Sequence, residues 1–205
     1  MFKPLTLGLS VAVVAAITGG YLFTQSDDLV KVAGQGVTDN SVAIATESYS
    51  AEQLSVMSPD TLIDMQKDAL AAAREDSSRE TDLTSVNGRP EFVSPAEWLI
   101  LNSVSAQNEN PDTELLRLVN LIRFNKRLEL WQKETDPQQR EALADAVLSL
   151  IPARVVNQDM SKEKAQSLQY RVLSSVLNDP AELRKRAGEE AARIGVQFGF
   201  DQASS

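Results

Sequence analysis

The chain has 205 residues, enough for one domain of ordinary size together with an anchor or a tail. Its 29 acidic and 20 basic residues give a formal charge of -9, which argues against a nucleic-acid-binding protein, because such proteins need a basic face. The absence of histidine and cysteine excludes disulfides, the usual zinc, haem and copper ligands, and catalytic triads that use either residue.

The chain opens with a long uncharged segment. Residues 4–25 carry no charged side chain, while Lys3 precedes them and Asp27 and Asp28 follow. A membrane-spanning helix needs about 20 apolar residues, whereas the apolar part of a cleaved signal peptide usually has about 7–15. We therefore expect residues 1–25 to be a transmembrane helix that acts as a signal anchor, with a cleaved signal or a buried core helix as the alternatives.

The charges around this segment predict its orientation. Lys3 and the α-amino group favour a cytoplasmic N-terminus, and Asp27 and Asp28 favour an exit on the other side. The expected location is the bacterial inner membrane, crossed once, with the C-terminal domain in the periplasm.

The next stretch has the composition of a disordered chain. Residues 24–95 contain 13 acidic and five basic side chains and few aromatic ones. Such a segment buries too little apolar surface to offset the entropy of ordering, so we expect residues 26–93 to be a mobile acidic spacer. A helix is predicted within it at 58–75, where Leu62 and Leu70 belong to an apolar stripe. This helix is either transient or a docking helix that folds on a partner.

Residues 94–205 read as an all-α domain, a bundle of about four to five helices. Ser94-Pro95, Asp136-Pro137 and Asp179-Pro180 each provide an N-cap oxygen and a proline at the first helical position, and Asn110-Pro111 is a weaker example. Apolar residues then recur with helical spacing. We expect Pro152 to end one helix and Gly195 to cap the last one.

The longest predicted helix, residues 112–134, carries two apolar stripes and should therefore be central, with neighbours on two sides. Arg123, Lys126 and Arg127 lie outside these stripes. They form either a solvated face or a binding patch for an acidic partner or lipid headgroups.

The tail, residues 196–200, alternates apolar residues with small or polar ones and includes Phe198 and Phe200. It either folds back to close the core or forms an exposed apolar strip that binds a partner.

Motifs for catalysis are missing. The sequence contains no G-x-S-x-G, no phosphate-binding glycine-rich loop, no HExxH and no EF-hand pattern. We therefore predict that the protein is not an enzyme and has no cofactor and no metal site, although loose acidic clusters are compatible with weak Ca²⁺ binding.

The phrases RFNKRLELWQKETDPQQREAL and ARVVNQDMSKEKAQSLQYRVL, together with the layout of anchor, spacer and helices, carry a family resemblance. The chain resembles the bacterial lipase-specific foldases (lipase chaperones) and the shorter phospholipase C accessory proteins over residues 94–195. The resemblance implies a helper of an exported enzyme, and calcium binding by analogy with the accessory proteins. The foldase motif RxxFDYxLSAxGE has no counterpart here, so its residues are not transferred.

These observations favour a membrane-anchored periplasmic accessory or chaperone-like protein that binds an exported enzyme, of the lipase or phospholipase class, or an envelope partner. The alternative is a structural adaptor subunit of a cell-envelope complex for secretion or division. The partner-binding residues predicted for either role are the apolar Leu62, Leu70, Phe198 and Phe200 and the basic Arg123, Lys126 and Arg127.

Overall fold

A computed structural model describes residues 45, 49–79 and 81–197 of the chain. All of them belong to the second of two units into which the chain divides, Val37–Ser205; the first, Met1–Gly36, lies outside the described residues. Within these ranges the chain forms helices and connecting loops, and no residue lies in a β-strand. The all-α class is therefore confirmed for the described part. The expected membrane helix at 1–25 lies outside it, and no described helix is long and apolar enough to cross a membrane.

The helices that begin at Pro59, Pro95, Pro111, Pro137 and Pro180 fall where the proline signals predict them, whereas those at Ala51 and Lys162 begin without a proline. The predicted helix at 58–75 and the predicted C-terminal helices are all found. Their bounds are α1 Ala51–Ser55, α2 Pro59–Glu75, the short 3₁₀ helix η2 Asp76–Ser78, α3 Pro95–Ser105, α4 Pro111–Lys133, α5 Pro137–Val156, α6 Lys162–Ser174 and α7 Pro180–Arg193.

Local hydrogen bonds explain these starting points. The hydroxyl of Ser94 accepts from the backbone N–H of Glu97 at 3.4 Å, and the carboxylate of Glu97 accepts from the N–H of Ser94 at 2.8 Å. Asp136 and Asp179 also accept backbone N–H groups of the helices that they precede. Asn110 makes no such side-chain bond, in keeping with the weaker signal at that position. Each cap satisfies donors that a helix leaves free in its first turn.

The prediction that Pro152 ends a helix is wrong. α5 continues through Pro152 to Val156. Proline removes one backbone hydrogen bond and crowds the preceding turn, which usually breaks a helix. Here Arg154, the second residue after Pro152, is fully buried and ion-paired with Asp82 and Asp159. These contacts hold the last turn of α5 in helical form.

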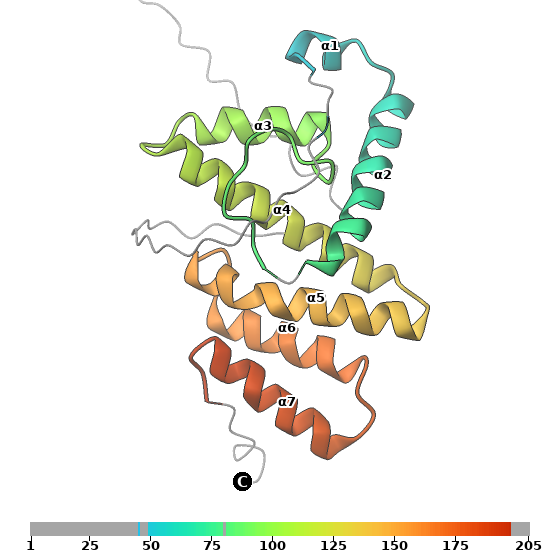
Figure 1. Ribbon diagram of the computed structural model, residues 1–205, viewed down its shortest axis with the longest axis vertical. Helices are drawn as coiled ribbons and strands as arrows, with labels where there is room; N and C mark the ends of the chain where they lie inside the picture. Colours follow the sequence, from blue (N-terminus) through green and yellow to red (C-terminus); the bar gives the residue numbers. More distant parts are fainter. Residues whose placement is uncertain (1–44, 46–48, 80, 198–205) are drawn as a thin grey trace, which may run out of the picture. The chain divides into compact units, whose positions relative to one another are not determined.

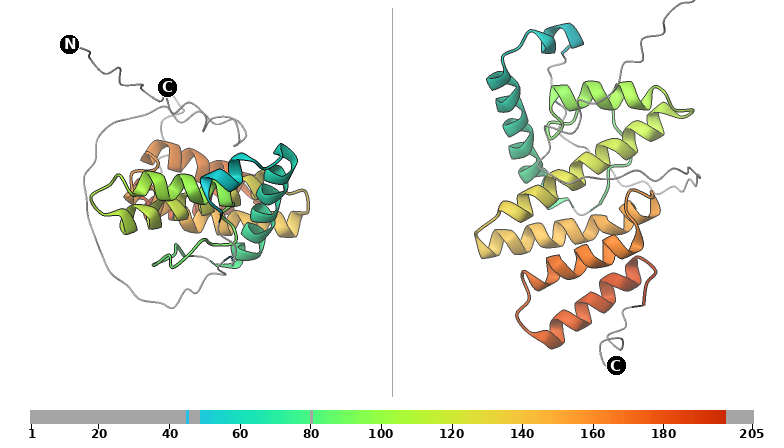
Figure 2. Two further views of the ribbon diagram at one scale, coloured as in Figure 1. Left: turned by 90° about the horizontal axis from the view of Figure 1, so that it is seen from above. Right: turned by 180° about the vertical axis from the view of Figure 1, so that it is seen from behind.

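Consecutive helices pack on one another. α3 contacts α4, α4 contacts α5, α5 contacts α6, and α6 contacts α7, as Figure 1 shows. α2 lies against α4 and α1 against α3, which can be followed from behind in Figure 2. α4 therefore has neighbours on several sides, and its predicted central position is confirmed.

The core forms where these helices meet. Val119, Phe124 and Trp131 of α4 are buried in one apolar cluster that also includes side chains of α5. Further buried side chains come from α6 and α7: Ala165, Leu168, Val172, Leu173 and Ala187. The apolar spacing seen in the sequence thus marks the buried faces of these helices.

Residues 81–93, which link η2 to α3, also pack against this core. Leu83, Phe92 and Val93 are buried. The side-chain amide of Asn120 on α4 bonds both the N–H and the carbonyl of Leu83, at 2.8 and 3.0 Å. The acidic stretch 26–93 therefore contains a packed part, which its overall composition does not distinguish from the remainder.

The C-terminal end of α7 is capped as predicted. Gly195 adopts the left-handed conformation with φ 67°, and the next N–H, of Val196, donates to the carbonyl of Ala191 at 3.0 Å. Val196 packs partly against the core. Phe198 and Phe200 lie outside the described residues, so the two interpretations of the tail stay open.

Replacement of Trp131 tests the core. Its ring is 3 % exposed, so Trp131→Ala should lower the free energy of unfolding by about 3–5 kcal/mol. The indole N–H has no acceptor among the described residues, and Trp131→Phe should therefore cost markedly less, roughly 1–2 kcal/mol. Urea denaturation measures both. A cost under about 1 kcal/mol for the alanine variant would place the ring outside the core.

Candidate functional site: a buried arginine cluster and the notch beside it

The basic residues predicted on α4 do not face solvent. Arg123 and Arg127 are 0 % exposed and Lys126 is 5 % exposed. The expectation of a solvated face is therefore wrong for all three. Together with Arg154 of α5, which is also 0 % exposed, Arg123 and Arg127 form what we call the arginine cluster.

Asp76 is the acidic centre of this cluster. It lies at the C-terminal end of α2 and is itself buried. Its Oδ2 accepts from Nε of Arg123 at 2.5 Å and from Nη2 of Arg127 at 3.1 Å. Its backbone carbonyl accepts from the same Nη2 of Arg127 at 2.6 Å. Two arginines one turn apart on α4 thus bind both the side chain and the backbone at the end of α2.

The arginine of α5 is held by other carboxylates. Arg154 pairs with Asp82, in the segment after η2, and with Asp159, in the loop after α5. Asp159 also pairs with Arg117 of α4. The cluster therefore joins α2, α4, α5 and the two segments that carry Asp82 and Asp159.

Burial governs the protonation of these groups. Burial, reinforced by the neighbouring Arg123, lowers the pKa of Arg127 to about 10. Burial likewise raises the pKa of Asp82 and of Asp159, although Arg154 and Arg117 oppose it. At neutral pH the arginine still carries its charge, because the pH lies well below its pKa. Arg127 thus carries its charge in a place withdrawn from water.

A second junction joins three helices around Glu97. Its carboxylate accepts from Nζ of Lys126 on α4 at 2.9 Å and from the side-chain amide of Gln66 on α2 at 2.9 Å. It also caps α3 through Ser94. Burial alone would raise the pKa of Glu97, but Lys126 and these hydrogen bonds outweigh it, and the pKa lies below its ordinary value.

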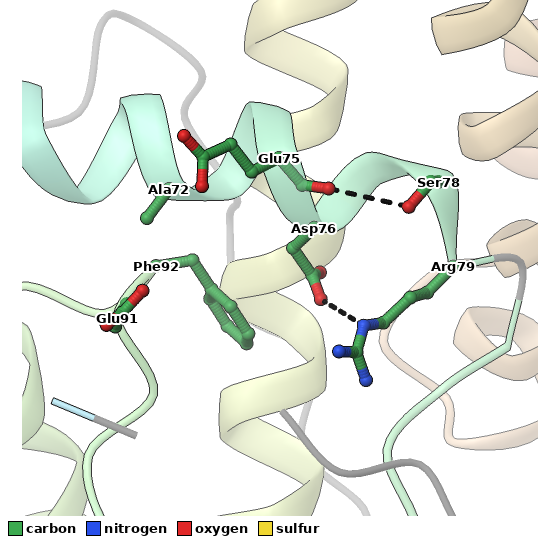
Figure 3. Close-up of a pocket in the computed structure, with 7 residues that line it drawn as sticks. All are labelled: Ala72, Glu75, Asp76, Ser78, Arg79, Glu91 and Phe92. Carbon is green, nitrogen blue, oxygen red and sulfur yellow. Dashed lines mark hydrogen bonds and ion pairs between the residues drawn. The ribbon is translucent and has the colours of Figure 1, made fainter. Parts of the chain in front are cut away.

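A notch of about 210 Å³ lies next to the arginine cluster. Figure 3 shows the residues around it, which belong to the end of α2, to η2 and to the segment before α3. Arg79 approaches Asp76 there, with Nε 3.3 Å from Oδ1. The lining residues are Ala72, Glu75, Asp76, Ser78, Arg79, Glu91 and Phe92.

The predicted apolar sites on α2 are only partly accessible. Leu62 and Leu70 are half-buried, and Leu70 packs against the core. The accessible large apolar side chain of this helix is instead Ile63, which is 52 % exposed. The structure does not bring Leu62 or Leu70 together with the arginine cluster on one open surface.

Sequence reasoning missed one exposed apolar feature on α3. Ile100 and Val104, one turn apart, are each 43 % exposed. The only charged residue of α3 is Glu97, in its first turn. That uncharged run was the available signal, but apolar residues at helical spacing are read first as a buried face.

The described residues offer no metal site. In the ranges 49–79 and 81–197 no three or more histidine, cysteine, aspartate or glutamate side chains are grouped so as to hold a metal ion. The carboxylates of the arginine cluster are instead bound by guanidinium groups. The arrangement fixes segments of the chain in place.

Comparison of the chain with family models, with curated proteins and with solved structures gave no match.

Removal of Asp76 tests the role of the cluster. Asp76→Ala leaves two buried arginines without their main acceptor, so the free energy of unfolding should fall by about 3–5 kcal/mol. Asp68→Ala on the exposed face of α2 is the matched control, with an expected change within about 0.5 kcal/mol. Chemical denaturation compares them, and equal small effects in both variants would contradict a structural role for Asp76.

The junction at Glu97 should make stability depend on pH. A carboxyl whose folded-state pKa lies below its ordinary value of 4.5 stabilises the fold above that pH, and the contribution is lost as pH falls through the folded pKa. Glu97→Gln should therefore be less stable than the wild type at pH 7, and the difference should shrink below about pH 4.5. Urea titrations at several pH values measure it. Lys126→Met should weaken this pH dependence, because burial, which raises the pKa of Glu97, then meets less opposition. A difference between Glu97→Gln and the wild type that is constant with pH would rule the mechanism out.

Proposed function

We propose that this protein is a membrane-anchored periplasmic accessory protein that binds an exported enzyme or an envelope partner through its helices. The observation that carries the proposal is the exposed apolar pair Ile100 and Val104 on α3. Exposed apolar side chains that lie together on a rigid element are typical of surfaces that bind other proteins.

The exposed residues of α3 and α7 differ in charge, and this difference supports α3 as the binding surface. Beyond Glu97, α3 presents no charged residue that would oppose the desolvation of Ile100 and Val104. On α7, by contrast, the exposed positions carry Arg184, Lys185 and Glu189. A partner helix laid along α3 would bury both apolar side chains at the spacing of one helical turn.

The N-terminal residues supply the proposed location. The uncharged segment 4–25 would anchor the chain in the inner membrane, and the acidic residues that follow would carry the helices into the periplasm. The lipase or phospholipase class of the partner rests on the family resemblance of residues 94–195 alone.

The buried arginine cluster favours the adaptor role as a second candidate. Its buried ion pairs fix α2 on α4. These helices therefore keep one arrangement and do not change conformation around a folding client. An adaptor in a secretion or division complex needs such a constant surface, whereas a chaperone releases its client.

Partner capture tests the proposal. Full-length protein is expressed in its own host, cross-linked in intact cells and purified, and the bound proteins are identified by mass spectrometry. The wild type should retain one exported enzyme or a defined set of envelope proteins. Ile100→Asp with Val104→Asp should reduce this recovery at least ~10-fold, because a charge opposes burial at both positions.

Two comparisons make the result decisive. Lys185→Glu on the exposed face of α7 should leave recovery unchanged, and circular dichroism should show equal helix content in all variants. A single exported enzyme that is later released supports the accessory protein, and stable membrane subunits support the adaptor. Recovery that is unaffected by the α3 substitutions would remove the support for this surface.

A further inference from the structure

A second apolar surface lies where α1 meets α2, at the end of the described part opposite α7 (Figure 1). Val56, which follows α1, is 84 % exposed, and Ile63, in the second turn of α2, is 52 % exposed. Both are more exposed than either apolar residue of the pair on α3. Half-buried side chains of the same short stretch complete what we call the arm surface: Val56, Met57, Leu62, Ile63 and Met65.

The arm surface lies outside the main core. The C-terminal half of α2 packs against that core through Leu70, Ala72 and Ala73, whereas, within the described residues, no member of the arm surface does so. Two of its members are methionines, whose flexible side chains adapt to the shape of a partner. The protein therefore keeps a group of apolar side chains here that does not contribute to the main core.

The charges around the arm surface are mostly negative. Residues 49–73 contain four acidic side chains and one basic side chain, that of Lys67. Nζ of Lys67 lies 2.8 Å from Oδ1 of Asp64, so this pair is neutral as a whole. In the described ranges, Asp60 and Asp68 pair with no basic side chain. The three aspartates follow one another at intervals of four residues and therefore lie along one side of α2.

An apolar surface bordered by carboxylates indicates the chemistry of its partner. We infer that the arm surface binds a basic amphipathic helix of another protein. The apolar side chains of that helix cover Val56 and Ile63, and its Lys or Arg side chains pair with Asp60 and Asp68. Asp60 precedes Ile63 by three residues, so acidic and apolar positions are neighbours on α2. A bilayer surface fits less well, because these carboxylates repel anionic headgroups.

The absence of cysteine allows a direct test in the full chain, held in nanodiscs of zwitterionic lipid. Ser55→Cys places a thiol next to Val56, and Ser167→Cys on α6 is the matched control, because both serines are exposed. The probe is a synthetic amphipathic helix of about 18 residues with leucine on one face and lysine on the other. Its single terminal cysteine is carried as a mixed disulfide with thionitrobenzoate. Attack by the protein thiolate joins the peptide to the protein and releases the coloured thionitrobenzoate anion.

Docking of the peptide raises its effective concentration at the nearby thiol. Thionitrobenzoate release should therefore be at least ~10-fold faster with Ser55→Cys than with Ser167→Cys. A peptide with glutamate in place of lysine should show no such preference, because the aspartates repel it. Equal rates for the two protein variants with the lysine peptide, or the same preference with the glutamate peptide, would overturn the inference.

The same two variants identify the other possible occupants when no peptide is present. Oxidation that yields a disulfide-linked dimer faster for Ser55→Cys than for Ser167→Cys would assign the arm surface to a second copy of the chain. Slower reaction of Ser55→Cys with iodoacetamide would show that the surface is already covered. The cover would be the bilayer if detergent removes the protection, and another part of the same chain if it does not. Each of these results would overturn the inference.

Substitutions in the Ser55→Cys background test the apolar contribution. Val56→Ser with Ile63→Ser should lower the rate with the lysine peptide to that of Ser167→Cys, because the peptide then finds little apolar area to cover. Val156→Ser, at a valine of α5 that is 79 % exposed, should leave the rate unchanged. Circular dichroism should show equal helix content in all variants.

A second pair of variants tests the charges. Asp60→Asn with Asp68→Asn should lower the rate about 3–10-fold at low salt and less at high salt, where the attraction is screened. Asp112→Asn with Glu141→Gln removes the same charge at exposed positions of α4 and α5 and should have little effect. Equal losses in both pairs would mean that only net charge attracts the peptide, which would contradict a site on the arm.

The arm surface and the α3 surface share no residue, so the two proposals fail separately. Ile100→Asp with Val104→Asp should leave the reaction of Ser55→Cys with the lysine peptide unchanged. Failure of the peptide test would likewise leave the proposed partner binding on α3 untouched.

Discussion

The burial of three arginines is the constraint on which the described structure depends. Arg123, Arg127 and Arg154 are each 0 % exposed, and a guanidinium group keeps its charge under nearly all conditions. Removing such a charge from water costs several kcal/mol unless carboxylates and carbonyls surround it. The end of α2 and the segment after it must therefore lie against α4 and α5, since Asp76 and Asp82 come from there. Buried ion pairs of this kind add little net stability, but they exclude arrangements that leave a charge unpaired.

The same constraint explains why an acidic, polar stretch of chain becomes ordered. Residues 81–93 are poor in apolar side chains, yet Leu83, Phe92 and Val93 are buried. Asn120 bonds the backbone at Leu83, and the ion pairs of Asp76 and Asp82, which precede Leu83, fix this part of the chain on α4 and α5. Polar contacts place the segment, and its few apolar residues then complete the core. α4 can be the central helix because its surface has two different parts. One part carries the arginines that pair with the end of α2, and another part is apolar and packs against α5.

Whether the sequence predicts a feature of this structure depends on how far apart in the chain the interacting residues lie. Helix starts at Pro59, Pro95, Pro137 and Pro180 were predictable, because each cap involves residues within one turn. The burial of Arg123 and Lys126 was not predictable, because their partners Asp76 and Glu97 lie 47 and 29 residues away in the chain. The continuation of α5 past Pro152 has the same origin, since Arg154 pairs with Asp82, 72 residues earlier.

The local character of the caps has a consequence for how this chain tolerates changes in length. Each helix from α3 to α7 carries its own starting signal or proline, so its register is set within its first turn. An insertion in the connection between α6 and α7, at 175–179, would lengthen a loop without rotating the buried face of α7. The connection between η2 and α3 is different, because Asp82 and Leu83 must reach fixed partners on α5 and α4. Changes in length should therefore accumulate among the later loops and be rare between residues 76 and 94.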